Sequence, residues 1–144
     1  MRNRLLVIAA GVGSAVVINL ILYALGRAAG GTFHFTSSSG PAIVDGLTVA
    51  AFSAVPLLLG LVAVALLARF GDWVIRTALV LGPLLAIGTI AVMTVPTDLD
   101  VTSKVTLAIC HIVLVPVMLV TVPALGRRHA APVRAGAASA AESG

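Results

Sequence analysis

The sequence predicts an all-α membrane protein, a four-transmembrane-helix antiparallel bundle, and two observations carry this prediction. The 144-residue chain is 60% hydrophobic and only 10% charged, whereas soluble domains carry about 25% charged residues. Four apolar runs each have about 20 residues, the length that a helix needs to cross a hydrocarbon core about 30 Å thick. These runs lack the alternation of barrel strands, so helices must satisfy their backbone groups within the membrane.

The four predicted helices form a single domain, residues 1–125. They cover about residues 5–25, 47–67, 74–95 and 105–125. The longest connection is a loop at about 26–46, where Pro41 has the pattern of a first-turn proline and would start the second helix early. The connection at 68–73 is short, which predicts an antiparallel pair of helices. Residues 126–144 are rich in Ala, Gly and Ser, and we expect them to form a disordered cytoplasmic tail.

The basic residues predict the orientation of the bundle. Cytoplasmic loops carry an excess of Lys and Arg. If the N-terminus lies in the cytoplasm, only Arg27 and Lys104 lie outside. The basic residues then on the cytoplasmic side are Arg2, Arg4, Arg69, Arg76, Arg127, Arg128 and Arg134. The chain is therefore predicted to be a multi-pass protein with both termini in the cytoplasm.

One polar side chain in each helix falls at a similar depth. Asn19, Ser53, Thr89 and His111 each lie six residues from the outer end of their predicted helix, or about 9 Å at the helical rise. They are therefore predicted to form one layer in the outer third of the bilayer. Tyr23 follows Asn19 by one turn and shares its helix face, which makes it an accessory candidate.

Two interpretations of this layer stay open. Polar groups at membrane depth often mark a functional site, and here they would form a small pocket with His111 as its titratable member. They also bond helices together, contributing about 0.6 kcal/mol per pair, and such a structural clasp is the simpler interpretation. Small residues at four-residue spacing, Gly11 with Ala15 and Gly82 with Ala86, favour close packing of helices in either case.

Several kinds of functional site are not predicted, because the sequence lacks the residues that they need. The single cysteine, Cys110, cannot form an internal disulfide or a CxxC pair. His111 is the only histidine at membrane depth, so a bis-histidine haem site is not predicted. No ligand set for zinc, no phosphate loop and no catalytic triad is found. We therefore expect no metal, no cofactor, no catalytic residue and no nucleic-acid partner.

Three segments resemble a known family. They are Asn19 to Gly30 (NLILYALGRAAG), Val55 to Gly60 (VPLLLG) and the pair Cys110 and His111. Together they resemble small four-helix integral membrane proteins of actinobacteria that are catalogued as a domain of unknown function. The resemblance would cover about residues 5–125. It implies a four-helix fold and a plasma-membrane location, and it supplies no activity, ligand or partner.

The sequence leaves three hypotheses for function. The first is a non-enzymatic membrane component that is structural or binds a membrane protein partner, or a second copy of itself, through a lipid-facing stripe of small residues. The alternative is a binder or transporter of a small solute that uses the layer of Asn19, Ser53, Thr89 and His111. A third is a pH sensor, because an unperturbed histidine titrates near pH 6.5. In each case the bilayer surrounds the helices.

Overall fold

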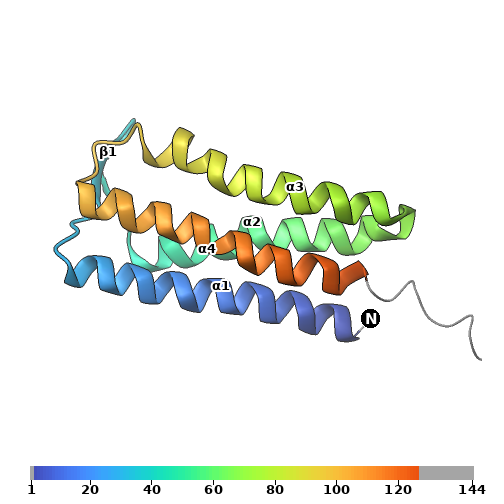
Figure 1. The fold of residues 1–144 in the computed structure, drawn as a ribbon. Coiled ribbons are helices and arrows are strands. Elements are labelled where there is room, and N and C mark those ends of the chain that lie inside the picture. Colours follow the sequence, from blue (N-terminus) through green and yellow to red (C-terminus); the bar gives the residue numbers. More distant parts are fainter. Residues whose placement is uncertain (1, 127–144) are drawn as a thin grey trace, which may run out of the picture.

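The computed structural model describes residues 2–126 and contains four long helices (Figure 1). They are α1 (Arg2–Ala28), α2 (Gly46–Leu67), α3 (Asp72–Thr89) and α4 (Val101–Gly126). A 3₁₀ turn, η1 (Ala68–Phe70), follows α2, and a π-helical turn, η2 (Ile90–Thr94), extends α3. Among the described residues these four helices are long and apolar enough to cross a membrane. The predicted all-α membrane fold is therefore confirmed. The predicted tail, apart from Gly126 at the end of α4, lies outside the described residues.

The helices form an open row of neighbours. Helix α1 packs against both α2 and α4, and α3 packs against α4, whereas α2 and α3 make few contacts with each other. The chain runs back and forth, so the start of α1 and the end of α4 lie together, opposite the strands (Figure 1). We call these the terminal end and the hairpin end of the bundle. The order across the bundle is α2, α1, α4, α3, with an opening between the two outermost helices.

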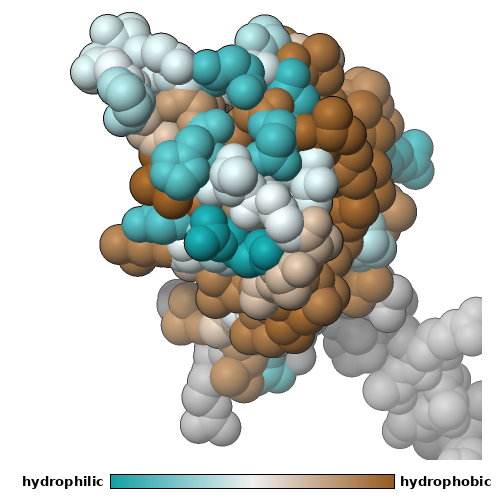
Figure 2. All heavy atoms as spheres, turned by 90° about the vertical axis from the view of Figure 1, so that its left-hand side faces the viewer, coloured by the Kyte–Doolittle hydropathy of each residue, from teal (hydrophilic) through white to brown (hydrophobic). Residues whose placement is uncertain are grey.

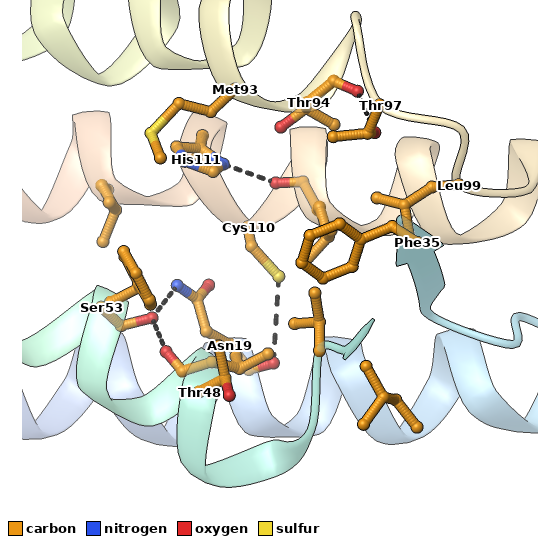
Figure 3. A pocket seen from close by; sticks show the side chains of 16 residues that line it. Asn19, Phe35, Thr48, Ser53, Met93, Thr94, Thr97, Leu99, Cys110 and His111 are labelled. Carbon is orange, nitrogen blue, oxygen red and sulfur yellow. Dashed lines mark hydrogen bonds between the residues drawn. The ribbon is translucent and has the colours of Figure 1, made fainter. Parts of the chain in front are cut away.

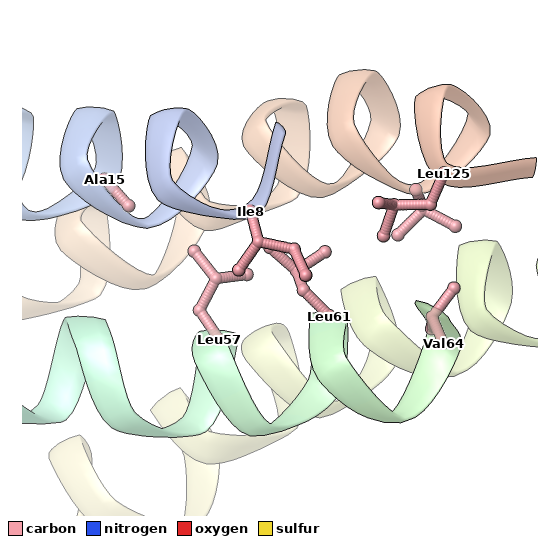
Figure 4. Packing of buried hydrophobic residues seen from close by; sticks show 7 residues of the cluster. Ile8, Ala15, Leu57, Leu61, Val64 and Leu125 are labelled. Atoms are coloured by element: carbon pink, nitrogen blue, oxygen red, sulfur yellow. The ribbon is translucent and has the colours of Figure 1, made fainter. Parts of the chain in front are cut away.

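The buried core lies toward the terminal end and is small. Ile8, Leu57, Leu61 and Leu125 pack together there (Figure 4). Most other large apolar side chains face outward, and Val92 is 75% exposed. Figure 2 looks onto the hairpin end, where hydrophilic residues gather while hydrophobic residues surround them. Apolar flanks with a polar end are the surface that a bilayer-spanning bundle requires.

Small residues allow α1 and α4 to approach closely. Gly11, Ala15 and Asn19 all lie on the buried face of α1. A methyl group added to Gly11 would lie 2.5 Å from Thr121 Cγ2 on α4. Gly82 likewise faces Met118, whose Sδ would lie 2.8 Å from an added methyl group. The predicted stripe on α1 is thus occupied within the bundle, whereas Gly82 and Ala86 on α3 also line a space between α2 and α3.

A two-stranded hairpin replaces the loop expected at 26–46. Strands β1 (His34–Ser37) and β2 (Gly40–Ile43) pair in antiparallel order, with Thr36 opposite Pro41. The early start of α2 at Pro41 was therefore wrong. The helix begins at Gly46, because the Asp45 side chain caps it by accepting from Thr48 N at 2.7 Å.

The connection between α3 and α4 holds the hairpin in place. Asp98 Oδ1 accepts from Thr36 N at 2.8 Å, and Asp100 Oδ2 accepts from Thr32 N at 3.0 Å and from Thr32 Oγ1 at 2.7 Å. Phe33 is fully buried behind them, with φ 59°, and its N–H donates to Ser103 Oγ at 2.9 Å. A left-handed backbone is strained for a bulky residue, so these contacts stabilise one defined cap over the hairpin end.

Candidate functional site

A cavity of about 430 Å³ lies between α1, α2, η2 and α4 near the hairpin end (Figure 3). We call it the hairpin-end cavity. Phe35 of β1 and Ile43 of β2 line it on the side of the hairpin. Its volume falls within the range of about 300–1,000 Å³ that is typical of small-molecule sites. Polar side chains from three helices therefore surround one largely apolar space.

Asn19 is the most deeply buried polar residue that lines this cavity, at 1% exposure. Its Nδ2 donates to Ser53 Oγ at 2.8 Å, and Ser53 Oγ donates in turn to Val49 O at 2.7 Å. Because the serine proton is used on Val49, Ser53 can only accept from Asn19, which fixes the orientation of the amide. The amide oxygen Oδ1 is then left without a hydrogen-bond partner among residues 2–126.

The free Asn19 oxygen needs an explanation. A buried acceptor without a partner destabilises a protein by about 1–3 kcal/mol, and native structures contain few of them. Figure 3 shows the amide projecting from α1 toward the space between Ser53 and Cys110. A hydrogen-bond donor bound in the cavity would satisfy this oxygen.

His111 presents a second acceptor. Its Nδ1 lies 2.7 Å from Leu107 O, and a carbonyl can only accept, so Nδ1 carries the proton. In the neutral ring Nε2 is then an acceptor, and no described residue donates to it. His111 lines the hairpin-end cavity together with Asn19 and Ser53. Three of the four predicted layer residues thus surround one space.

The other two predicted residues lie elsewhere. Thr89 does not line the hairpin-end cavity, and its hydroxyl donates to Ala86 O at 2.8 Å. Tyr23 packs on Phe33, with ring centroids 4.7 Å apart, and lines neither this cavity nor the one described next. Tyr23 therefore supports the cap rather than the site.

A second cavity, of about 460 Å³, runs between α2 and α3 with α4 behind it, and we call it the groove. Thr89 lies on its wall. Phe52, Met93, His111 and Leu114 line both spaces. The groove and the hairpin-end cavity therefore adjoin at His111.

One comparison with known proteins identifies a family. A family model described as a family of unknown function (DUF6069) matches residues 1–131. The chain belongs to this family. No curated protein and no solved structure matches the DUF6069 chain. Membership confirms the resemblance to a domain of unknown function. It does not bear on the source, so the actinobacterial origin stays a prediction.

The site of this DUF6069 protein suits an uncharged ligand. Within the described residues no Asp, Glu, Lys or Arg lines either cavity, and no group of three or more His, Cys, Asp or Glu could hold a metal ion. A charged ligand would lose its hydration without gaining a counter-charge, at a large energetic cost. Two open acceptors in an apolar space instead favour a neutral molecule that donates hydrogen bonds.

Sequence reasoning missed four polar contributors to the DUF6069 cavity, which are Thr48, Thr94, Thr97 and Cys110. Thr94 lines it from η2 and is 4% exposed. Cys110 also lines it, and its thiol donates to Asn19 O at 3.9 Å. No sequence pattern predicts the π-helical turn in which Thr94 lies. Such turns are frequent at functional sites.

Proposed function

We propose that this membrane protein binds a small uncharged molecule in the hairpin-end cavity, as a non-enzymatic binder. One observation carries the proposal: Asn19 lines an open cavity, and its buried Oδ1 has no partner among the described residues. His111, which lines the same space, adds a second acceptor in its Nε2. The bound molecule donates hydrogen bonds to these two atoms through hydroxyl groups, while its apolar part contacts the cavity wall.

A structural or partner-binding role ranks second. That role would use small residues on a lipid-facing stripe, but Gly11 faces Thr121 of α4, Ala15 is fully buried and Gly82 faces Met118. A bond such as Asn19 to Ser53 serves a helix clasp equally well. A clasp alone gives no reason for an open cavity beside an unsatisfied oxygen, so binding accounts for more of the geometry.

The test uses glycerol monobutyrate, an uncharged molecule with two hydroxyl groups and a short apolar chain. It is titrated into the detergent-solubilised protein while the ring signals of His111 and His34 are followed by NMR. His34 is exposed and lines neither cavity, so it serves as an internal reference. We expect a saturable shift at His111 alone.

Two variants sharpen this test. Asn19→Leu should weaken binding about tenfold, the effect of losing one hydrogen bond in an apolar site. Thr89→Val, which removes a hydroxyl outside the cavity, should change the affinity by less than about twofold. Equal, non-saturating shifts at both histidines would show that the cavity does not bind this class of molecule.

We also infer that the protein is a multi-pass component of the plasma membrane with both termini in the cytoplasm. The support is the distribution of basic residues: Arg69 and Arg76 lie toward the terminal end, whereas Arg27 and Lys104 lie toward the hairpin end. The hairpin end then faces the outside of the cell.

A further inference from the structure

The groove adds a ligand class to the proposed function, on which this inference rests. We propose that the bound molecule is a single-chain lipid with an uncharged, hydroxyl-bearing head group. Its head group lies in the hairpin-end cavity, and its hydrocarbon chain lies in the groove between α2 and α3.

The two spaces adjoin, which supports one elongated ligand. Phe52, Met93, His111 and Leu114 line both of them, so side chains rather than a helix stand between head and chain. His111 stands at the junction, where its Nε2 can accept from a head-group hydroxyl. A compact solute would fill the hairpin-end cavity and leave the groove empty.

The length of the groove matches one lipid chain. Along α2 its lining extends from Phe52 to Val64, which is twelve residues or about 18 Å at the helical rise. Half of a hydrocarbon core about 30 Å thick is about 15 Å. The groove is thus long enough for one lipid chain, and because it begins about 9 Å below the outer end of α2 it crosses the middle of the bilayer.

The groove opens sideways rather than to water. Phe52 of α2 and Leu85 of α3 line it and are 65% and 68% exposed on the flanks of the bundle. At the other end, Phe35 and Ile43 of the hairpin line the hairpin-end cavity. A molecule dissolved in the bilayer therefore reaches the site through the opening between α2 and α3.

A lipid chain gains little free energy on moving from the bilayer to an equally apolar groove. The head group therefore determines which lipid binds. Asn19 Oδ1 and His111 Nε2 are both acceptors, which selects hydroxyl donors. Phosphate and carboxylate head groups would enter an apolar space whose described lining carries no cationic side chain. Monoacylglycerol is the simplest lipid with this chemistry.

The experiment uses monooleoylglycerol and its di-O-methyl ether, which keeps the chain but cannot donate. Each is placed at equal mole fraction in nanodiscs that contain the full chain, and bound lipid is counted by native mass spectrometry. We expect one bound monooleoylglycerol per chain and about tenfold lower occupancy by the ether. This comparison needs no variant, so it holds even if Asn19→Leu does not fold.

A variant that blocks the groove tests where the chain lies. Gly60 lines the groove, and a methyl group added there meets no atom within 4 Å. Gly60→Phe should reduce monooleoylglycerol binding about tenfold while glycerol monobutyrate still shifts the His111 signals. Gly13→Phe is the matched control, because Gly13 is equally unobstructed and lines neither cavity.

The outcomes separate the two proposals. If glycerol monobutyrate binds but monooleoylglycerol and its ether bind equally, the lipid inference is wrong and the binding function stands. If neither glycerol ester binds, both fail. If Gly60→Phe instead dissociates a dimer and leaves lipid binding unchanged, the groove is an interface between two copies and the inference is overturned.

Discussion

At the scale of single residues, Asp100 joins the hairpin to α4. Its two carboxylate oxygens accept from the backbone and side chain of Thr32, and from Ser103 N at 2.9 Å and Ser103 Oγ at 2.6 Å. The same side chain therefore caps α4 and holds the chain just before β1. The side chain of Ser103 in turn accepts from Phe33 N.

We expect Asp100→Asn to loosen the cap. An amide has one acceptor oxygen instead of two, so either the contact of Ser103 N is lost, or both Thr32 contacts are lost together with that of Ser103 Oγ. The Thr32 amide should then exchange with deuterium about tenfold faster, as expected for one lost charge-assisted hydrogen bond. Asp72→Asn, at the opposite end of the bundle, is the control and should leave Thr32 protected.

The same contact predicts a pH dependence. Hydrogen bonds from Ser103, followed by those from Thr32, hold the pKa of Asp100 well below its usual range. A pKa that is lowered by folding stabilises the fold above the ordinary value of about 3.9, and this contribution is lost as the pH falls through the lowered value. The protection of the Thr32 amide against deuterium exchange, corrected for the intrinsic exchange rate, should stay constant from about pH 7 to about pH 5. A loss within that range would contradict this assignment.

The sequence identifies part of the site at this scale. Counting from helix ends selects Asn19, Ser53 and His111, because depth depends only on the helical rise. It also selects Thr89, whose side chain lies in the groove instead. The depth of a residue in the bilayer does not say in which direction around the helix axis its side chain points. Depth alone therefore cannot distinguish the hairpin-end cavity from the groove where both lie at the same level. The unpartnered Asn19 oxygen depends on side-chain contacts that counting cannot supply.

At the scale of elements, the seam between α1 and α4 depends on glycine. Gly11 lies against Thr121, and a methyl group added to Gly26 would lie 2.5 Å from Thr106 Oγ1. The two glycines occupy both halves of α1, so the two helices stay close over most of their length. Such contacts stabilise membrane helices through van der Waals packing.

Gly11→Val should therefore destabilise the bundle. The added side chain must displace Thr121, and overpacking of this kind costs about 1–3 kcal/mol. Reversible unfolding in mixed micelles measures the change. Gly13→Val is the control, since no atom lies within 4 Å of a methyl group added there, and it should stay within about 0.5 kcal/mol of the parent. Equal stability of both variants would exclude a tight seam at Gly11.

Elements differ in how well sequence predicts them. Apolar runs define the four helices, because the bilayer imposes their length. The hairpin has four-residue strands, too short for a clear alternating pattern, and its position depends on Asp98 and Asp100, more than 60 residues further along. The turn η2 likewise has no sequence signature comparable to a helix cap.

At the scale of the whole molecule, neighbouring helices in sequence are not always neighbours in space. The short connection expected at 68–73 predicts that α2 and α3 pair, yet they touch little, and α3 packs on α4. All four helices are apolar around most of their circumference, so hydropathy does not determine which faces meet. The groove, on which the lipid inference depends, follows from this arrangement.

The proposed orientation is tested by cysteine labelling in intact cells, in a Cys110→Ala background. Ser38, in the turn of the hairpin, and Arg69, in η1, are both exposed at opposite ends of the bundle. A membrane-impermeant maleimide should label the Ser38→Cys variant and spare the Arg69→Cys variant until the cells are lysed. Labelling of the second alone would reverse the proposed sides.

The α1–α4 seam also has a consequence for biogenesis. Among the described helices it joins the one that is made first to the one that is made last. While α2 and α3 are being made, the glycine face of α1 has no α4 to pack against, although Asn19 can already bond to Ser53 on α2. Helix α3, whose main neighbour is α4, also lacks its packing partner until α4 has been made. The four-helix fold is therefore complete only once α4 has been made, and a chain that stops before α4 leaves both α1 and α3 without their main partner.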